Sequence, residues 1–121
     1  MVPMRILIYS GMPETYQSLM DMIRVIAAER MEKVEFFHVS DYDVFRRSLV
    51  DNGYDLIIVA EKGARGMEVC IGARKIRPHA PLFWFSDDPL FAAQSYRLSC
   101  TYFGQLPVSF HIMENALRRI G

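Results

Sequence analysis

Residues 56–60, Leu-Ile-Ile-Val-Ala, decide the fold, because they form an uninterrupted apolar run between Asp55 and Glu61. A short run of this kind, rich in β-branched residues, predicts a strand that is buried on both faces, as in the middle of a parallel sheet. The run at 4–9, which is apolar except for Arg5, and the largely aromatic run at 82–85 also predict strands. The sequence therefore predicts a sheet with at least these three strands.

Stretches of helical periodicity separate the apolar runs. We expect two further strands, at 34–38 and 102–105, and an exposed loop at 61–66 because it holds two glycines and three charges. Helices are expected at 14–30, from a Ser40 cap to Asn52-Gly53, at 67–77, from Asp88-Pro89 to Leu98, and from a Ser109 cap to Ile120. Five β-α units result, which predicts one α/β domain over residues 1–121, a three-layer αβα sandwich with a parallel sheet in order 2-1-3-4-5.

The composition excludes several classes of function. Lys and Arg together number 14, as do Asp and Glu, so the net charge is zero and strong non-specific binding to nucleic acid or anionic lipid is not expected. The two cysteines, Cys70 and Cys100, lack metal-site spacing and predict reduced thiols. No apolar run is long enough for a membrane span, and we expect a cytoplasmic protein. The isolated histidines support no enzyme activity.

Four segments carry a resemblance to a known family. They are Asp55-Leu-Ile-Ile-Val, Gly66-Met-Glu-Val with Ala73-Arg-Lys-Ile-Arg, Ala80-Pro-Leu-Phe-Trp-Phe-Ser, and Leu106-Pro-Val-Ser-Phe with Ala116-Leu-Arg-Arg-Ile. Together with the element order, they resemble the receiver domain of bacterial response regulators, most closely the LytTR type. The resemblance implies a CheY-like, flavodoxin-like fold and a role in two-component signal transduction or transcription regulation. It also implies a cis peptide bond at Leu106-Pro107.

The residues that carry receiver chemistry are missing. Receivers accept a phosphoryl group on an aspartate at the end of the third strand, with Mg²⁺ held by that aspartate and an acidic pair after the first strand. A divalent cation requires such carboxylate oxygens, and phosphoryl transfer requires nearby positive charge. The acidic pair corresponds here to Ser10 and Gly11, the acceptor to Ala60 and the lysine before proline to Leu106. The hydroxyl residue, Ser86, and the aromatic switch residue, Phe103, are retained. We therefore expect a degenerate receiver, or pseudo-receiver, without metal, cofactor or catalysis.

Two alternatives stay open. One is a receiver phosphorylated at a non-standard residue, with Glu61, Asp87 or Asp88 supplying carboxylates. If the strand extends as far as Glu61, this side chain is expected to point away from Ala60, because side chains alternate along a strand. Asp88 is better explained as a helix cap. The other is a flavodoxin-like FMN-binding protein, since the small and hydroxyl residues of 9–15 lie between a strand and a helix N-terminus. Pro13 and Glu14 weaken that reading, because proline removes an N–H donor and glutamate adds negative charge.

The segment from Pro89 to Leu98 predicts an interaction surface. Its apolar residues spread around more than one helical face, so a helix packed on one side of a sheet leaves some of them outside. We expect Leu90, Phe91, Tyr96 and Leu98 to form an interface with a protein partner or a second copy, through the fourth helix, fifth strand and last helix. The structural alternative is that these residues pack under loops. A DNA-binding half of a LytTR-like regulator would lie outside this chain.

Overall fold

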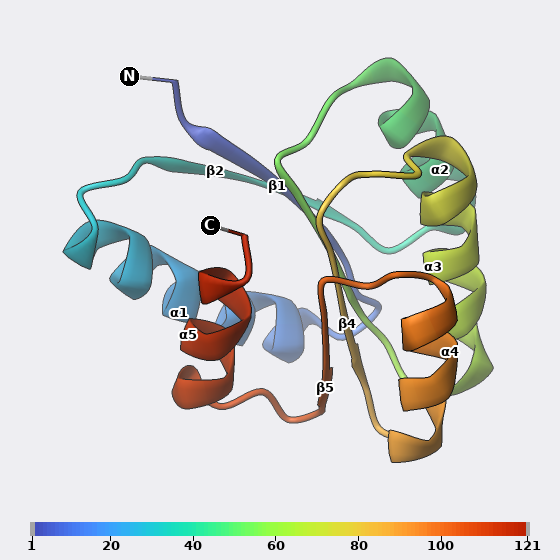
Figure 1. Cartoon of the computed structure of the whole chain (residues 1–121). Helices are drawn as coiled ribbons and strands as arrows, with labels where there is room; N and C mark the ends of the chain where they lie inside the picture. The colour runs from blue at the N-terminus through green and yellow to red at the C-terminus, as the bar shows by residue number, and fades with distance from the viewer. Residues whose placement is uncertain (1, 121) are drawn as a thin grey trace.

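The computed structural model describes residues 2–120 and contains the expected parallel sheet. Its strand order is β2-β1-β3-β4-β5, and every neighbouring pair is parallel. This is the order predicted from the sequence. The strands, visible in Figure 1, are β1 (Met4–Tyr9), β2 (Val34–Val39), β3 (Leu56–Ala60), β4 (Leu82–Ser86) and β5 (Tyr102–Gln105).

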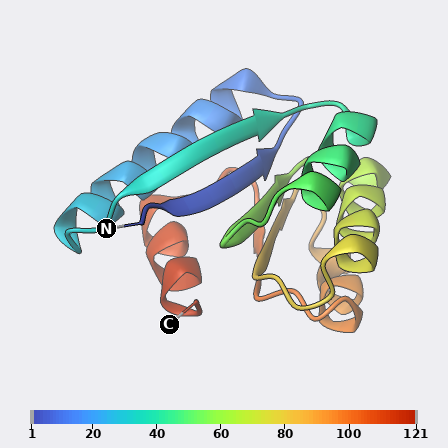
Figure 2. The same cartoon turned by 90° about the horizontal axis from the view of Figure 1, so that it is seen from above.

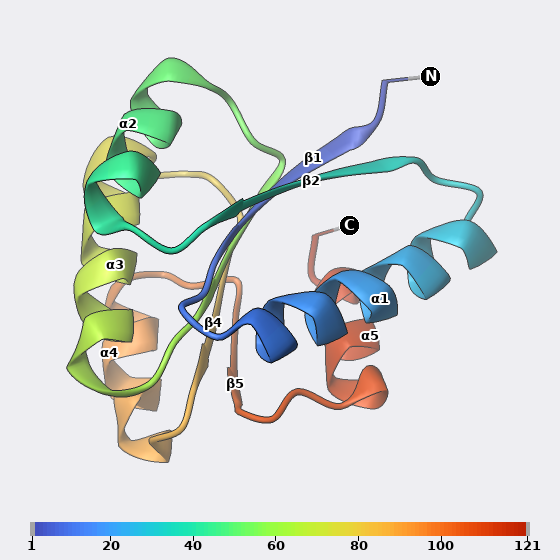
Figure 3. The same ribbon diagram turned by 180° about the vertical axis from the view of Figure 1, so that it is seen from behind.

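Helices cover both faces of the sheet. One layer holds α1 (Pro13–Glu29) and α5 (Phe110–Arg118), and the other holds α2 (Tyr42–Asp51), α3 (Gly63–Ile76) and α4 (Ala92–Arg97). The view from behind in Figure 3 and the view from above in Figure 2 show the same two layers with the sheet between them. Each layer encloses its own apolar core.

The side-chain alternation of β3 divides its residues between the two cores. Leu56, Ile58 and Ala60 join the core under α1 and α5, whereas Ile57 and Val59 join the core under α2, α3 and α4. All five are fully buried, because a central parallel strand is covered on both faces. The apolar run that predicted this strand therefore reflects burial from two sides.

The predicted loop at 61–66 is wrong, because helix α3 already begins at Gly63. Gly63 takes a left-handed conformation, with φ of 65°, and its N–H donates to Asp87 Oδ1 at 2.9 Å. This turn directs the chain into the helix after only two residues. Gly66, expected in the loop, lies buried inside the helix. The two glycines of this segment suggested a loop. Instead, Gly63 provides the turn into the helix, and Gly66 lets α3 lie close to the Glu61 carbonyl and to Trp84.

Two helix starts also differ from the prediction. Asp41, and not Ser40, caps α2: its Oδ1 accepts hydrogen bonds from the N–H groups of Asp43 at 2.8 Å and Val44 at 3.3 Å. The segment after Asp88 begins with a 3-10 turn over 89–91, and regular helix runs only from Ala92 to Arg97. Asp88 itself is the predicted cap, since its Oδ1 accepts from Leu90 N at 2.9 Å.

The Leu106-Pro107 peptide bond is cis, as the resemblance implied. Among the helices within residues 2–120, none has the length and apolarity to cross a membrane.

Candidate functional site

The candidate site is the sheet edge at the carboxyl ends of β1, β3 and β4, which we call the crevice after the place where open α/β sheets bind ligands. The strand register brings these ends together, since Tyr9 is level with Val59 and Ala60 is level with Phe85. In an open α/β sheet, ligands bind at this edge, next to the point where the strand order reverses. The residues that follow β1 and β3 are therefore neighbours at this edge of the sheet.

Ala60, the position of the missing acceptor, is fully buried. Its methyl group belongs to the core under α1 and α5, together with Ile8, Ile58 and Phe85. A methyl group offers no oxygen to a metal ion and no nucleophile to a phosphoryl group. The last position of β3 thus contributes to packing.

The side chain of Glu61 reaches the loop after β1, and the condition for it to point away from Ala60, that the strand extends to residue 61, is not met. Strand β3 ends at Ala60, so the alternation of side chains does not extend to the next residue. The Glu61 carboxylate instead accepts a hydrogen bond from Gly11 N at 2.9 Å through Oε2, and one from Lys62 N at 3.2 Å through Oε1. A carboxylate therefore lies beside the loop where the family has its acidic pair.

Asp87 supplies a second carboxylate at the same edge. Its Oδ1 accepts from Gly63 N at 2.9 Å and from the hydroxyl of the fully buried Ser86 at 3.4 Å. The hydrogen bond from Gly63 N–H is the main cause that lowers the pKa of Asp87. Through these bonds, the hydroxyl and the carboxylate join the end of β4 to the start of α3.

The side chains at this edge do not fit the magnesium ion that the resemblance implies. Mg²⁺ requires octahedral oxygen ligands and is usually bound through one or two carboxylates. Here the Glu61 and Asp87 carboxylates are hydrogen-bonded to backbone N–H groups of different loops. Over residues 2–120, no three His, Cys, Asp or Glu side chains are grouped in a way that could hold a metal ion.

His38 lies at the β1 side of the crevice. Sequence spacing alone presents this histidine as an isolated residue. Its Nε2 donates to the carbonyl oxygen of Ser10 at 2.8 Å, and its ring stacks on Tyr16 with centroids 3.9 Å apart. Ser10 is fully buried, and its hydroxyl accepts from Met12 N at 3.1 Å. The available signal was the register, because β2 runs parallel to β1 and sets His38 level with Ile8.

The two remaining family positions both contribute to packing. Leu106 packs against the core under α1 and α5, and its N–H donates to the carbonyl of Ser86 at 2.9 Å. Phe103 is half-buried and meets Trp84 edge to face, with ring centroids 5.4 Å apart. The position of the family's lysine therefore carries no positive charge toward the crevice.

The predicted interface separates into an exposed and a packed pair. Leu90 is 82% exposed and Tyr96 is 87% exposed, as the surface hypothesis requires. Phe91 is half-buried, with its ring 5.3 Å from that of Trp84, and Leu98 packs against the same core. Phe91 and Leu98 are therefore only partly available to a partner, because the 3-10 turn and the helix end place part of each side chain against the core. The structural alternative applies to these two residues.

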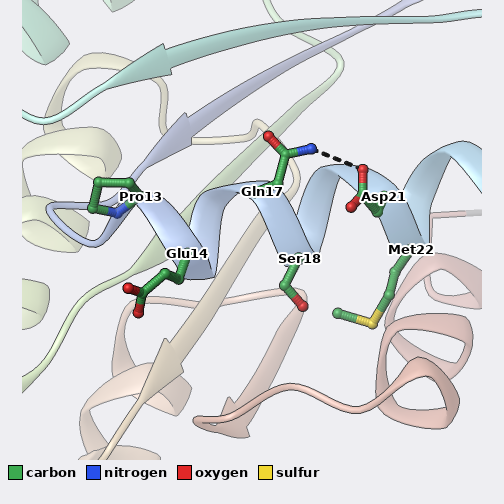
Figure 4. Close-up of a pocket in the computed structure, with 6 residues that line it drawn as sticks. All are labelled: Pro13, Glu14, Gln17, Ser18, Asp21 and Met22. Carbon is green, nitrogen blue, oxygen red and sulfur yellow. Dashed lines mark hydrogen bonds between the residues drawn. The ribbon is translucent and has the colours of Figure 1, made fainter.

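An open groove of about 700 Å³ runs along α1 and is shown in Figure 4. Its lining comes from this one helix, and Gln17 donates to Asp21 at 2.9 Å within it. A smaller groove of about 220 Å³ lies between the same end of α1 and Pro107-Val108. Neither groove contains a residue that the sequence singled out as a receiver-site or interface residue.

Comparison with known proteins gives a match of fold only. No family model and no curated protein matches the chain. Among solved structures, a CheY-like response regulator receiver domain protein from Methanospirillum hungatei has a TM-score of 0.79 at 13% identity, covering 98% of this chain and 94% of that one. A signal receiver domain of a two-component histidine kinase from Clostridium thermocellum has a TM-score of 0.79 at 15% identity, covering 98% of each. The response regulator TrrA from Thermotoga maritima, solved with Mg²⁺ and BeF, has a TM-score of 0.77 at 15% identity, covering 98% and 99%. The chain therefore has the fold of the CheY-like receiver domains of response regulators.

Proposed function

We propose that the chain is a pseudo-receiver, a regulatory module of two-component-type signal transduction that acts through protein contact without aspartyl phosphorylation and without catalysis. The observation that carries this proposal is Ala60, a fully buried methyl group at the position of the phosphoacceptor. Phosphoryl transfer needs a nucleophile and surrounding positive charge. This position and Leu106 supply neither.

The hydrogen bonds of the crevice support the same proposal. A phosphoryl group is stabilised by N–H donors and cations aimed at its oxygens. Here the N–H groups of Gly11, Lys62 and Gly63 donate to the carboxylates of Glu61 and Asp87. The chain's own negative charge thus takes the donors that an incoming phosphoryl group would require.

The partner would be a protein or a second copy, bound through α4, β5 and α5. Support comes from Leu90, in the 3-10 turn before α4, and Tyr96, on α4, two large side chains that are more than four-fifths exposed. The segment from Leu106 to Phe110 supports the finer proposal that the module is the input half of a LytTR-type transcription regulator in the cytoplasm. In such a regulator, a domain other than this one would bind the DNA.

The FMN-binding alternative has weaker support. Pro13 is the first residue of α1, so it offers no N–H there, and Glu14 places a carboxylate in the first turn. Gly11 N–H, a donor that a phosphate at this loop would use, donates to Glu61. Purified protein with a bound yellow flavin would reverse this preference.

Incubation with acetyl phosphate and Mg²⁺, followed by intact-mass measurement, tests the proposal. We expect no phosphoryl adduct on the wild-type chain, whereas a receiver with an intact acceptor site run alongside acquires one. Hydroxylamine distinguishes the two possible adducts, because it cleaves an acyl phosphate on a carboxylate and leaves a phosphate ester on a serine intact. Glu61→Gln and Asp87→Asn serve as matched variants. An adduct that disappears in Glu61→Gln would overturn the proposal in favour of a receiver phosphorylated at a non-standard residue.

A further inference from the structure

The two cysteines of the chain meet inside the core under α3 and α4. Cys70 lies on α3 and is fully buried, and Cys100 lies in the loop between α4 and β5, where it is half-buried and packs against the same core. Arg74, one helical turn after Cys70, donates hydrogen bonds to the two residues that precede Cys100, so the fold brings the two cysteines into the same part of the core, where each thiol influences the pKa of the other. Because the chain has two cysteines in all, each thiol has one possible partner within the molecule.

Several hydrogen bonds hold Cys100 in this position. The Arg74 guanidinium, also on α3, donates to the carbonyl of Leu98 at 2.6 Å and to that of Ser99 at 2.8 Å. Cys100 N donates to Ser95 O at 2.9 Å, and Ser99 has a left-handed backbone with φ of 53°. These contacts fasten the two residues before Cys100 to α3 and Cys100 itself to α4. The loop that carries Cys100 is therefore held beside the helix that carries Cys70.

The surroundings make the two thiols chemically unequal. The hydrogen bond from Cys70 lowers the pKa of Cys100, and the positive charge of Arg74 acts in the same direction. Burial raises the pKa of Cys70, and its contact with Cys100 adds to this effect. The thiolate is the nucleophilic form of cysteine. Cys100 is thus the more reactive and more accessible thiol, and Cys70 is its protected neighbour.

We propose that Cys70 and Cys100 form an oxidation site for peroxides, at which the pair closes to a reversible disulfide between α3 and the loop after α4. The site is independent of the phosphoryl chemistry, since it lies in the core on the α3 side and uses none of the residues of the crevice. A disulfide there would fix covalently the loop that Arg74 now holds by hydrogen bonds, and with it the end of the helix that carries Tyr96.

The reaction balances with hydrogen peroxide as the oxidant. The Cys100 thiolate attacks one peroxide oxygen, so that an S–O bond forms, the O–O bond breaks and hydroxide leaves as water after taking up a proton. The Cys70 sulfur then attacks the sulfenic sulfur of Cys100. An S–S bond forms, the S–O bond breaks, and a second water leaves with the Cys70 proton. Two thiols are oxidised by two electrons, and one peroxide is reduced to two waters.

The test treats the purified chain with hydrogen peroxide, unfolds it, alkylates the remaining thiols and counts the alkyl groups by mass, so that oxidation of the eight methionines is not mistaken for the reaction. We expect both thiols to be lost together, to return after dithiothreitol, and to appear in one cross-linked peptide pair. Cys100→Ala should leave Cys70 reduced at the same peroxide concentration. Cys70→Ala should accumulate a sulfenic acid on Cys100 that dimedone traps.

Three results would overturn the proposal. The first is a wild-type chain whose thiols stay reduced under conditions that oxidise free glutathione. The second is a disulfide between two molecules in place of one within the molecule. The third is irreversible oxidation of Cys100 while Cys70 stays alkylatable. The wild-type measurement decides each of these alone, so the proposal remains testable if Cys70→Ala fails to fold.

Discussion

The Glu61 carboxylate accepts a hydrogen bond from the Gly11 backbone N–H at 2.9 Å, and this bond joins the end of β3 to the loop after β1. The two residues are 50 positions apart in the sequence. A Cβ atom added at Gly11 would lie 2.8 Å from Glu61 Oε2, so the absence of a side chain lets the carboxylate approach the backbone. The crevice is thus bridged by a contact that depends on both residue types.

Replacing Glu61 should therefore weaken the fold at this edge. Glu61→Ala removes a carboxylate that two N–H groups use, and we expect a loss of about 1–2 kcal/mol in the free energy of unfolding. Glu61→Gln keeps an acceptor oxygen and should lose less. Gly11→Ala should resemble Glu61→Ala, because its methyl group displaces the carboxylate. Urea denaturation measures all three, and Glu68→Ala, which removes an exposed ion pair with Arg65, is the control that should stay near wild type.

Asp87 gives the prediction on pH dependence. The N–H of Gly63 is the main cause that lowers its pKa in the folded chain, so the folded state holds the proton less tightly than the unfolded state does. The stabilisation is complete above the unfolded pKa of about 3.9 and is lost as the pH falls through the lowered folded value. Asp87→Asn should therefore make the decline of the melting temperature at acid pH less steep. At neutral pH the variant should melt at a slightly lower temperature than the wild type, by an amount that does not depend on pH. An unchanged acid decline would assign the pH dependence to other carboxyl groups.

The central strands β3 and β4 could be predicted from the sequence because strands that are buried on both faces consist of apolar residues. The runs at 4–9, 56–60 and 102–105 match β1, β3 and β5 at both ends. The helix starts could not be predicted as well, since a glycine is equally suited to a loop and to a left-handed helix entry. Gly63 is the second case, and its partner, Asp87, comes from a distant strand end.

The prediction of the candidate site depended on single residues at the ends of strands, where side chains no longer alternate between the two faces of the sheet. That Ala60 lacks acceptor chemistry follows from its side chain alone. The position of the Glu61 side chain, in contrast, depended on whether β3 ends at residue 60 or one residue later. Phe91 was assigned to the surface on the assumption of regular helical spacing after Pro89. The 3-10 turn over 89–91 has a different spacing and sets the Phe91 ring against Trp84.

Gly66→Ala should destabilise the chain through a steric conflict inside α3. A Cβ atom there would lie 2.8 Å from the carbonyl oxygen of Glu61 and 3.0 Å from Trp84 Nε1. We expect a loss of about 1–3 kcal/mol in the free energy of unfolding, the usual range for overpacking, and a shift in the fluorescence of the single tryptophan. Gly53→Ala is the matched control, because nothing lies within 4 Å of its added Cβ. Equal stability of the two variants would mean that α3 moves away without cost.

The last prediction separates packing from association at α4. Phe91→Ala removes a ring that packs on Trp84 and should lower the free energy of unfolding by about 2 kcal/mol, less than the loss for a fully buried phenylalanine. Leu90→Ser and Tyr96→Ser remove side chains that are more than four-fifths exposed, so the melting temperature should stay close to that of the wild type.

If the surface of α4 binds a protein, the same two serine variants should change association instead. Truncation of exposed apolar anchors weakens binding without creating a cavity. Sedimentation over a range of concentrations measures self-association, and titration with a partner measures binding to another protein. Val50→Ser, which truncates a residue that is 64% exposed on α2, is the control that should leave both measurements unchanged. Equal effects of Val50→Ser and Tyr96→Ser would mean that general surface hydrophobicity causes the association and that α4 is not the contact surface.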